Sequence, residues 1–186
     1  MDVKDVIYTR RSFRSLTPIE ITENLIKDLA ECASLAPSCK NSQPWRFVFV
    51  YERKQLEKLQ KALIAPNDKW VANASMIIAV YSNVRYDCII KERLYYLFDT
   101  GLATAFIILR ATELGLVAHP IAGFEEVKVK EILKIPPDMR VITLLIIGKK
   151  SKTIDHNLTE LMRETELHKP SRLKFSEFAY INEYTP

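Results

Sequence analysis

The densest cluster of chemically capable side chains lies near the N-terminus, in segment 9–14, whose sequence is TRRSFR. Guanidinium groups bind phosphate oxygens in a two-pronged geometry, and a hydroxyl adds a short hydrogen-bond donor. The cluster therefore suits a phosphate monoester, which carries close to two negative charges. These residues alone leave a second interpretation open, a solvated basic surface at the end of a short helix, where the helix dipole favours cations.

A second polar cluster follows in segment 36–45, whose sequence is APSCKNSQPW. A proline near each end restricts the backbone, and the residues between them carry small hydroxyl and amide groups. Such side chains on a stiff loop suit the edge of a flat heteroaromatic ring. The alternative is a capped loop between two elements, with Trp45 packed in the core.

Glycine is scarce, which limits how a phosphate group can be held. The four glycines are scattered at Gly101, Gly115, Gly123 and Gly148, so neither a dinucleotide-binding G-x-G-x-x-G nor a Walker loop is present. We therefore expect side-chain cations and hydroxyls to bind any phosphorylated cofactor. The formal net charge is only +4, and nucleic acid is a disfavoured partner because no long basic stripe is present.

The three cysteines, Cys32, Cys39 and Cys88, form no C-x-x-C pair. We expect reduced thiols in a cytoplasmic protein, with neither a disulfide framework nor a zinc site. The chain opens with segment 1–5, MDVKD, which does not resemble a signal peptide. The uncharged stretch 100–109 is about half a membrane span, so we expect a buried core helix there and no membrane partner.

Hydrophobic periodicity predicts one α+β domain over residues 1–186, since the length suits about one domain. Thr22 is expected to cap the second helix. The expected helices are 2–9, 25–36, 55–64, a long one from about 91 or 99 to 114, and 125–133, and the expected strands are 46–51, 76–81, 117–121 and 141–147.

The tail, residues 151–186, mixes aromatic and apolar residues with charges and shows no continuous core stripe. Such a segment buries itself poorly, so it is expected either to wrap over a partner subunit or to form a flexible arm. The three histidines, His119, His156 and His168, show no triad partner and no metal-ligand spacing, so no metal is expected. For His119 a packed or solvent-facing histidine is preferred over one that borders a ligand ring.

Four segments, taken together, resemble the flavin-dependent nitroreductase family. They are Arg10-Arg11-Ser12, Pro37-Ser38 with NSQPW at 41–45, Asp99-x-Gly101 with LGL at 114–116, and PIAGF at 120–124. The segments follow the order and approximate spacing of the family and span nearly the whole chain. The resemblance implies an α+β fold with a central, mostly antiparallel sheet flanked by helices, and a C-terminal arm that extends over the partner subunit.

The resemblance also implies a homodimer with FMN at its interface and NADH or NADPH as electron donor. Hydride transfer through flavin N5 would be ping-pong, with nitroaromatics, quinones or similar small molecules as acceptors. No side chain would need to act as an acid or base, because the reaction chemistry belongs to the flavin.

Site residues carry over from the family by position. Those implied for the FMN phosphate and ribityl chain are Arg10, Arg11, Ser12, Arg14 and, from the segment Lys169-Pro170-Ser171-Arg172, Arg172. Those implied to reach the flavin of the other subunit are Pro37, Ser38 and Asn41, and those implied near the ring are Asn67, Ala122 and Gly123. The chain departs from the family at Ala122, where many members have Glu, and at Asp99, where some have glutamine.

Alternatives remain at this stage. A flavin-binding or storage protein would share the same site without turnover. A specialised member of the same scaffold could carry out flavin fragmentation, dehalogenation or ene reduction, although 186 residues leave little room for an inserted lid. A basic nucleic-acid module would show strong salt-dependent binding.

Overall fold

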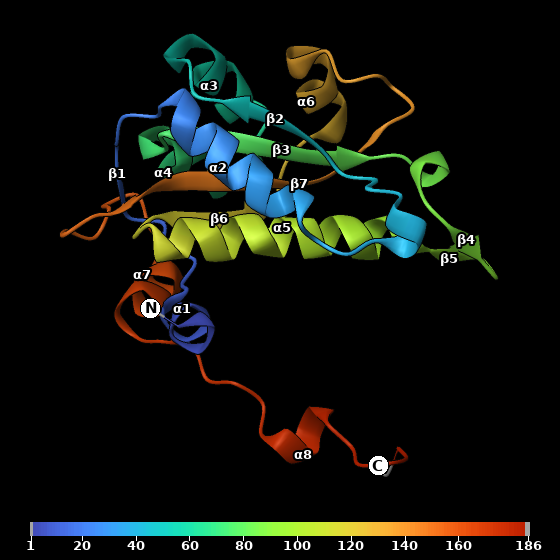
Figure 1. The fold of residues 1–186 in the computed structure, drawn as a ribbon. Helices are drawn as coiled ribbons and strands as arrows, with labels where there is room; N and C mark the ends of the chain where they lie inside the picture. The colour runs from blue at the N-terminus through green and yellow to red at the C-terminus, as the bar shows by residue number, and fades with distance from the viewer. Residues whose placement is uncertain (1, 185–186) are drawn as a thin grey trace.

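The computed structural model describes residues 2–184, which form an α+β fold around one main sheet (Figure 1). The helices are α1 (Val3–Thr9), α2 (Glu23–Ser34), α3 (Arg53–Gln60), α4 (Asn67–Trp70), α5 (Tyr95–Glu113), α6 (Glu126–Leu133), α7 (Glu160–Leu167) and α8 (Phe175–Phe178). The strands are β1 (Leu16–Thr17), β2 (Arg46–Val50), β3 (Met76–Ser82), β4 (Ile89–Ile90), β5 (Arg93–Leu94), β6 (Val117–Ile121) and β7 (Arg140–Lys150).

Every strand pairing among the described residues is antiparallel, as the family resemblance implies. β7 lies at the centre of the five-stranded sheet, where it pairs with β3 and β6, and its last two residues pair with β1. β2 extends the sheet beyond β3. β4 and β5 form a separate small hairpin just before α5.

Both faces of the sheet are covered, so its strands are apolar at successive positions rather than alternately polar. On β3, Ile77 and Ala79 face the layer that holds α3 and α6, while Met76, Ile78 and Val80 face α2 and α5. Each fully buried aliphatic side chain of this size stabilises the fold by roughly 1.5–3 kcal/mol. This continuous burial explains why the strand predictions agree with the structure to within a few residues.

The long helix α5 is 19 residues, or about 28 Å, and runs beneath the sheet in Figure 1. Its inner side packs Ala103, Ile107 and Ala111 against the sheet. Its outer side leaves Phe98 57% exposed and Gly101 exposed. The expectation that this helix is buried on all sides is therefore wrong for a single chain. Nothing in residues 2–184 covers its outer stripe.

Several boundaries differ from the predictions. α5 begins at Tyr95, after the β4–β5 hairpin, and α3 ends at Gln60, because Ile64 donates its N–H to the Gly123 carbonyl (3.0 Å) instead of continuing the helix. Thr22 caps α2 as expected, since its hydroxyl accepts the Leu25 N–H. No helix of the described part of the chain is long and apolar enough to cross a membrane.

The expectation of reduced thiols is wrong for two of the three cysteines. Cys39 and Cys88 form a disulfide, and their Cα atoms are 6.2 Å apart. The bond joins positions 49 residues apart, so sequence spacing gave no sign of it. Cys32, on α2, is a free thiol.

Candidate functional site

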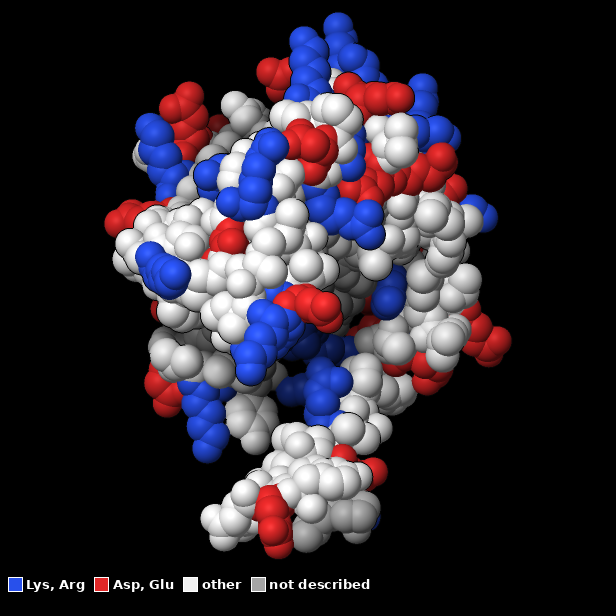
Figure 2. Space-filling model, turned by 90° about the vertical axis from the view of Figure 1, so that its right-hand side faces the viewer, with Lys and Arg blue, Asp and Glu red and all other residues white. Residues whose placement is uncertain are grey.

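The basic residues near the N-terminus line one cavity together with residues that follow α7. The lining residues are Arg10, Arg11, Ser12, Arg14, Thr165, Lys169, Pro170 and Arg172. Figure 2 shows Lys and Arg side chains gathered around a hollow between the main body and the C-terminal segment. The structure thus brings together all five residues implied for a phosphate group, although they come from opposite ends of the chain.

Helix α7 forms the far wall of this cavity and is fixed to the N-terminal segment by polar contacts. The buried Glu166 carboxylate accepts the N–H groups of Arg14 (2.7 Å) and Ser15 (3.2 Å). The Arg11 guanidinium donates to the carbonyls of Thr165 (2.5 Å) and His168 (3.1 Å), at the end of α7 where carbonyls lack helical partners. Sequence reasoning missed Glu166 and Thr165, since nothing in the local sequence marks them.

The other arginines of the cavity keep donors available. Arg10 donates to the Ser12 hydroxyl (3.2 Å), and Arg14 donates through one guanidinium nitrogen to Thr165 (3.0 Å). The Arg14 Nε is buried and has no hydrogen-bond acceptor within residues 2–184. Burial, followed by the charges of Arg172 and Arg11, lowers the pKa of Arg10. A bound anion would relieve this repulsion and accept hydrogen bonds from the guanidinium groups that line the cavity, so the cavity fits a phosphate group.

His119 connects the cavity to the interior of the same chain. Its Nδ1 lies 3.2 Å from the Phe13 carbonyl, and its ring stacks on Trp70 with centroids 4.9 Å apart. Burial, with smaller contributions from Arg14 and Arg10, lowers the pKa of His119 to about 4, although the Phe13 carbonyl opposes the shift. The ring is therefore neutral at pH 7 and donates from Nδ1. His119 is buried, so of the two preferred arrangements the packed one agrees with the structure and the solvent-facing one does not.

Trp70 leads on to the residues implied near the flavin ring. Its Nε1 donates to the side-chain Oδ1 of Asn67 (3.1 Å), and the Asn67 Nδ2 lies 3.5 Å from the Gly123 carbonyl oxygen. A Cβ at Gly123 would lie 2.6 Å from the Asn67 Nδ2, so any larger residue there would displace the Asn67 amide. Within the described residues, the N–H groups of Ala122 and Gly123 have no acceptor and can serve a ligand.

The loop implied to reach the other subunit's flavin lines a different cavity. Pro37, Ser38 and Cys39 face Asp99, Phe98 and the β4–β5 hairpin there. Three of the loop's residues have positive φ: Lys40, Asn41 and Gln43. Such conformations in residues other than glycine cost energy and concentrate at ligand-binding segments.

Asp99, the position that departs from the family, anchors this loop. It is 1% exposed, and its carboxylate accepts the Cys39 N–H at 2.7 Å. Burial raises the pKa of Asp99; the Cys39 N–H opposes this shift, and the neighbouring Asp87 carboxyl reinforces it. Asp99 is thus committed to loop geometry within its own chain.

The two groups of predicted ligands lie at opposite ends of α5. α1 and α7, which flank the arginine cavity, lie below the end where α5 stops, while the β4–β5 hairpin lies at the end where it starts (Figure 1). The helix between them is about 28 Å long. Within one chain, packed residues therefore link the arginine cavity to Asn67 and Gly123. Pro37, Ser38 and Asn41 of the same chain lie far from both.

A helix-flanked antiparallel sheet with a cationic cavity defines a nitroreductase-type α+β protein, and comparison with known proteins gives the same class. A sequence model described as the nitroreductase family matches residues 7–69 and 65–149. The chain belongs to the nitroreductase family, and the protein is an oxidoreductase of that family.

Individual relatives agree with this assignment. A protein from Archaeoglobus fulgidus, provisionally named an NADH dehydrogenase/NAD(P)H nitroreductase, is 31% identical over 77% of this chain and 82% of its own length. The structure of a nitroreductase family protein from Clostridium novyi has a TM-score of 0.76 at 30% identity, covering 82% of this chain and 87% of that one. A solved oxidoreductase containing FMN has a TM-score of 0.85 at 26% identity, covering 97% and 91%.

Proposed function

We propose that this protein is an FMN-dependent NAD(P)H oxidoreductase that reduces nitroaromatics, quinones or similar acceptors by a ping-pong reaction. The observation that carries the proposal is the arginine cavity with its unsatisfied buried donor, joined through His119 and Trp70 to the free N–H groups beside Asn67. A dianion at one end and a polar ring edge at the other match the two ends of FMN.

Within the cavity the residues have different roles. Arg10, Ser12, Arg14 and Arg172 would bind the FMN phosphate, because all four residues line the cavity. Arg11 would have mainly a structural role. Its guanidinium hydrogen-bonds the end of α7 and so positions the cavity wall that carries Arg172.

At the ring end, Asn67 and the N–H groups of Ala122 and Gly123 would orient the cofactor. FMN, when bound, would supply the hydride-transfer chemistry between NADH or NADPH and the acceptor. The positive cavity favours negative charge on its ligand. No side chain is assigned an acid–base role, and the low pKa of His119 keeps that ring neutral.

The proposal includes a homodimer. The exposed outer stripe of α5, with Leu97, Phe98 and Gly101, is the kind of apolar surface that a second copy covers. A two-fold axis near the middle of α5 would bring the Ser38 loop of one chain toward the arginine cavity of the other. Pro37, Ser38 and Asn41 would then contact the partner's flavin.

The remaining parts of the proposal concern the whole chain. Residues 1–186 would form one domain in a cytoplasmic protein, where NADH and NADPH are available. The extension 151–186 would wrap over the partner. It packs locally through α7, while beyond α7 the exposed Phe175, Phe178 and Tyr184 leave the main body (Figure 1).

An anaerobic absorption spectrum, recorded before and after adding NADH and then NADPH, tests the proposal. Flavin bands that bleach with either donor would support a reductase, and the faster donor would identify the preferred nicotinamide. Bands that persist would indicate a flavin-binding protein without turnover. A colourless protein that takes up no FMN would refute the assignment of the cofactor.

A further inference from the structure

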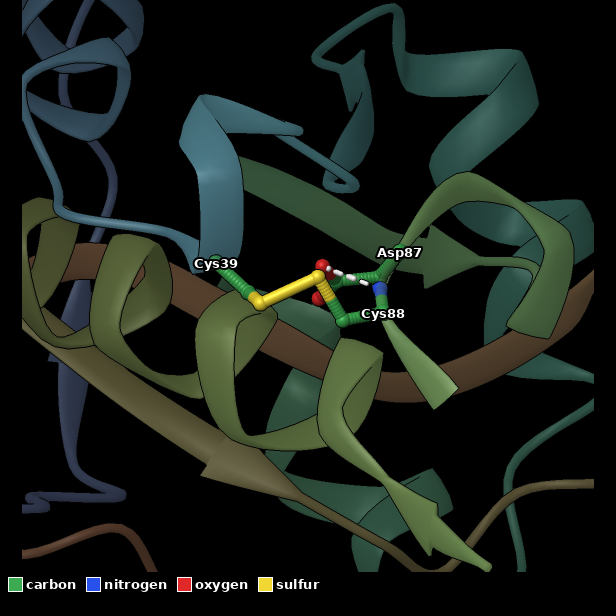
Figure 3. Close-up of side chains that lie close together, drawn as sticks. All are labelled: Cys39, Asp87 and Cys88. Atoms are coloured by element: carbon green, nitrogen blue, oxygen red, sulfur yellow. Dashed lines mark hydrogen bonds between the residues drawn. A yellow bond between two sulfur atoms is a disulfide. The ribbon is translucent and has the colours of Figure 1, made fainter. Parts of the chain in front are cut away.

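The Cys39–Cys88 disulfide joins the loop that carries Ser38 to the β4–β5 hairpin (Figure 3). Cys39 lies directly after Ser38 and lines the same cavity, and both cysteines are half-buried. A sulfur that borders an open cavity is accessible to a reductant in that cavity. The bond is therefore placed for chemistry as well as for stability.

One carboxyl group lies close to the sulfurs, and a second lies close to the Cys39 backbone. An oxygen of Asp87 is within 4.8 Å of both sulfur atoms, and its Oδ2 is buried with no hydrogen-bond partner among residues 2–184. Asp99 contacts the Cys39 N–H, and burial and Asp87 raise the pKa of its carboxyl. This shift favours the protonated form of Asp99, and a protonated carboxyl is a proton source for a departing thiolate.

The hairpin depends on the disulfide for its attachment. Within the described residues, segment 88–94 makes no hydrogen bond to the rest of the chain beyond Asp87, and Ile89 and Leu94 are 62% and 51% exposed. Besides the flanking residues Asp87 and Tyr95, the hairpin adjoins the Ser38 loop and α5 through Ile90 and Arg93, which line the same cavity. Opening the bond would release the hairpin from the loop without disturbing the core.

We propose that Cys39–Cys88 is a redox-active disulfide that a two-electron donor in this cavity opens, which frees the β4–β5 hairpin. The S–S bond breaks, the two sulfurs gain two electrons and two protons, and both cysteines become thiols. The donor is either the reduced flavin, which is oxidised by two electrons, or a pair of thiols, which become a disulfide. Persistent disulfides are rare in the cytosol, where those present are usually catalytic or sensing.

The flavin source rests on the proposed function, whereas the thiol source does not. The experiment therefore treats the full-length protein anaerobically in three separate arms: with NADH or NADPH, with light and EDTA to reduce bound flavin directly, and with reduced glutathione. Iodoacetamide then traps free thiols, and mass spectrometry counts them. We expect the count to rise from one, Cys32, to three in at least one arm.

Limited trypsin digestion provides a second readout, because Lys91 and Arg93 lie in the hairpin. Cleavage there is expected to accelerate several-fold when the bond opens, and Cys88→Ser should show the fast rate without any reductant. Cys32→Ser is the matched control, which lowers the thiol count by one in every state and leaves cleavage unchanged. If Cys88→Ser does not fold, the thiol count and the cleavage rate of the wild-type protein, with and without reductant, test the proposal.

Each outcome separates the two proposals. Opening by NAD(P)H or light identifies the flavin as donor, and opening by glutathione alone identifies thiols. A bond that stays closed in every arm until denaturant is added, while the flavin bleaches, would overturn the redox role and leave the reductase intact. If glutathione opens the bond but the flavin never bleaches with NAD(P)H, the redox role of the disulfide would stand and the reductase proposal would fail. Structural disulfides resist reduction by glutathione, so this arm discriminates.

Discussion

The two ends of α5 differ in how much of a binding site one chain builds there. At the C-terminal end, Glu166 and Arg11 lock α7 against the N-terminal segment, and the arginine cavity has walls on both sides. At the N-terminal end, the Ser38 loop is anchored by Asp99 but faces an open cavity beside exposed Phe98. In the proposed homodimer, the first region would be a complete half-site, whereas the second would be completed by another subunit.

Phe98→Glu gives the largest expected effect, because it places a charge in the proposed apolar interface. An unpaired buried charge costs about 3 kcal/mol or more, so the dissociation constant of the dimer should increase at least about 100-fold. Flavin should be lost as the dimer dissociates. Sedimentation across a concentration series measures the change. Val127→Glu, on exposed α6 at the other face of the sheet, is the matched control. An unchanged dimer in Phe98→Glu would place the interface elsewhere.

Acid should lower the free energy of unfolding of the protein through His119, which lies beside the complete half-site. Its folded pKa of about 4 lies below 6.5, so the unfolded chain binds a proton that the folded chain does not. Stability is therefore fully present above about pH 6.5 and falls by about 3 kcal/mol as the pH drops toward 4. Denaturant unfolding at several pH values measures the slope.

The matched variants for that slope are His119→Gln, which should flatten it, and His156→Gln, which removes an exposed histidine and should leave it unchanged. An identical slope in wild type and His119→Gln would mean that another group is responsible. The carboxyls also titrate in this window, so the comparison between variants is the informative quantity.

Arg10→Ala should remove one charged donor from the complete half-site while leaving the fold dimeric. Hydrogen bonds to charged groups contribute about 1.5–3 kcal/mol, so FMN should bind about 10- to 150-fold more weakly. Fluorescence titration with FMN measures this change. Arg53→Ala, in an exposed ion pair with Glu57 on α3, changes the net charge equally and should have no effect. An unchanged FMN affinity in Arg10→Ala would refute the phosphate assignment.

Gly123→Ala should have the smallest effect, because it displaces only the Asn67 amide. We expect a loss of less than about tenfold in FMN affinity, which corresponds to at most about 1.4 kcal/mol. The double variant Asn67→Ala/Gly123→Ala should lose little beyond Asn67→Ala alone, since the clash is then relieved. Strictly additive losses would show that the two residues act independently.

The sequence predicted best what depends on local pattern. The strands around Ile78 and Leu144 were predictable because both faces of the sheet are covered, which leaves continuous apolar runs. Helix α7 was not, since Glu166 acts through the backbone of Arg14, 152 residues earlier in the chain. The β4–β5 hairpin likewise has no hydrophobic period, and its attachment depends on a disulfide that spans 49 residues.

The candidate site was predictable in its residue types but not in its arrangement. Clustered arginines indicated a phosphate, and the family resemblance supplied Arg172. The engagement of Arg11 with the carbonyls of α7, and of Asp99 with the Ser38 loop, depends on contacts between distant segments. No periodicity or spacing rule reports such contacts, so the division between ligand and positioning residues required the structure.

The most direct test of the shared site is complementation between two broken chains. Arg10→Ala and Ser38→Trp chains, co-expressed with different tags, would each lose flavin as homodimers. In the purified heterodimer, one site would contain intact Arg10 from one chain and intact Ser38 from the other, so we predict about one flavin per dimer. A heterodimer that binds no flavin, although each chain is folded, would contradict a site shared between subunits.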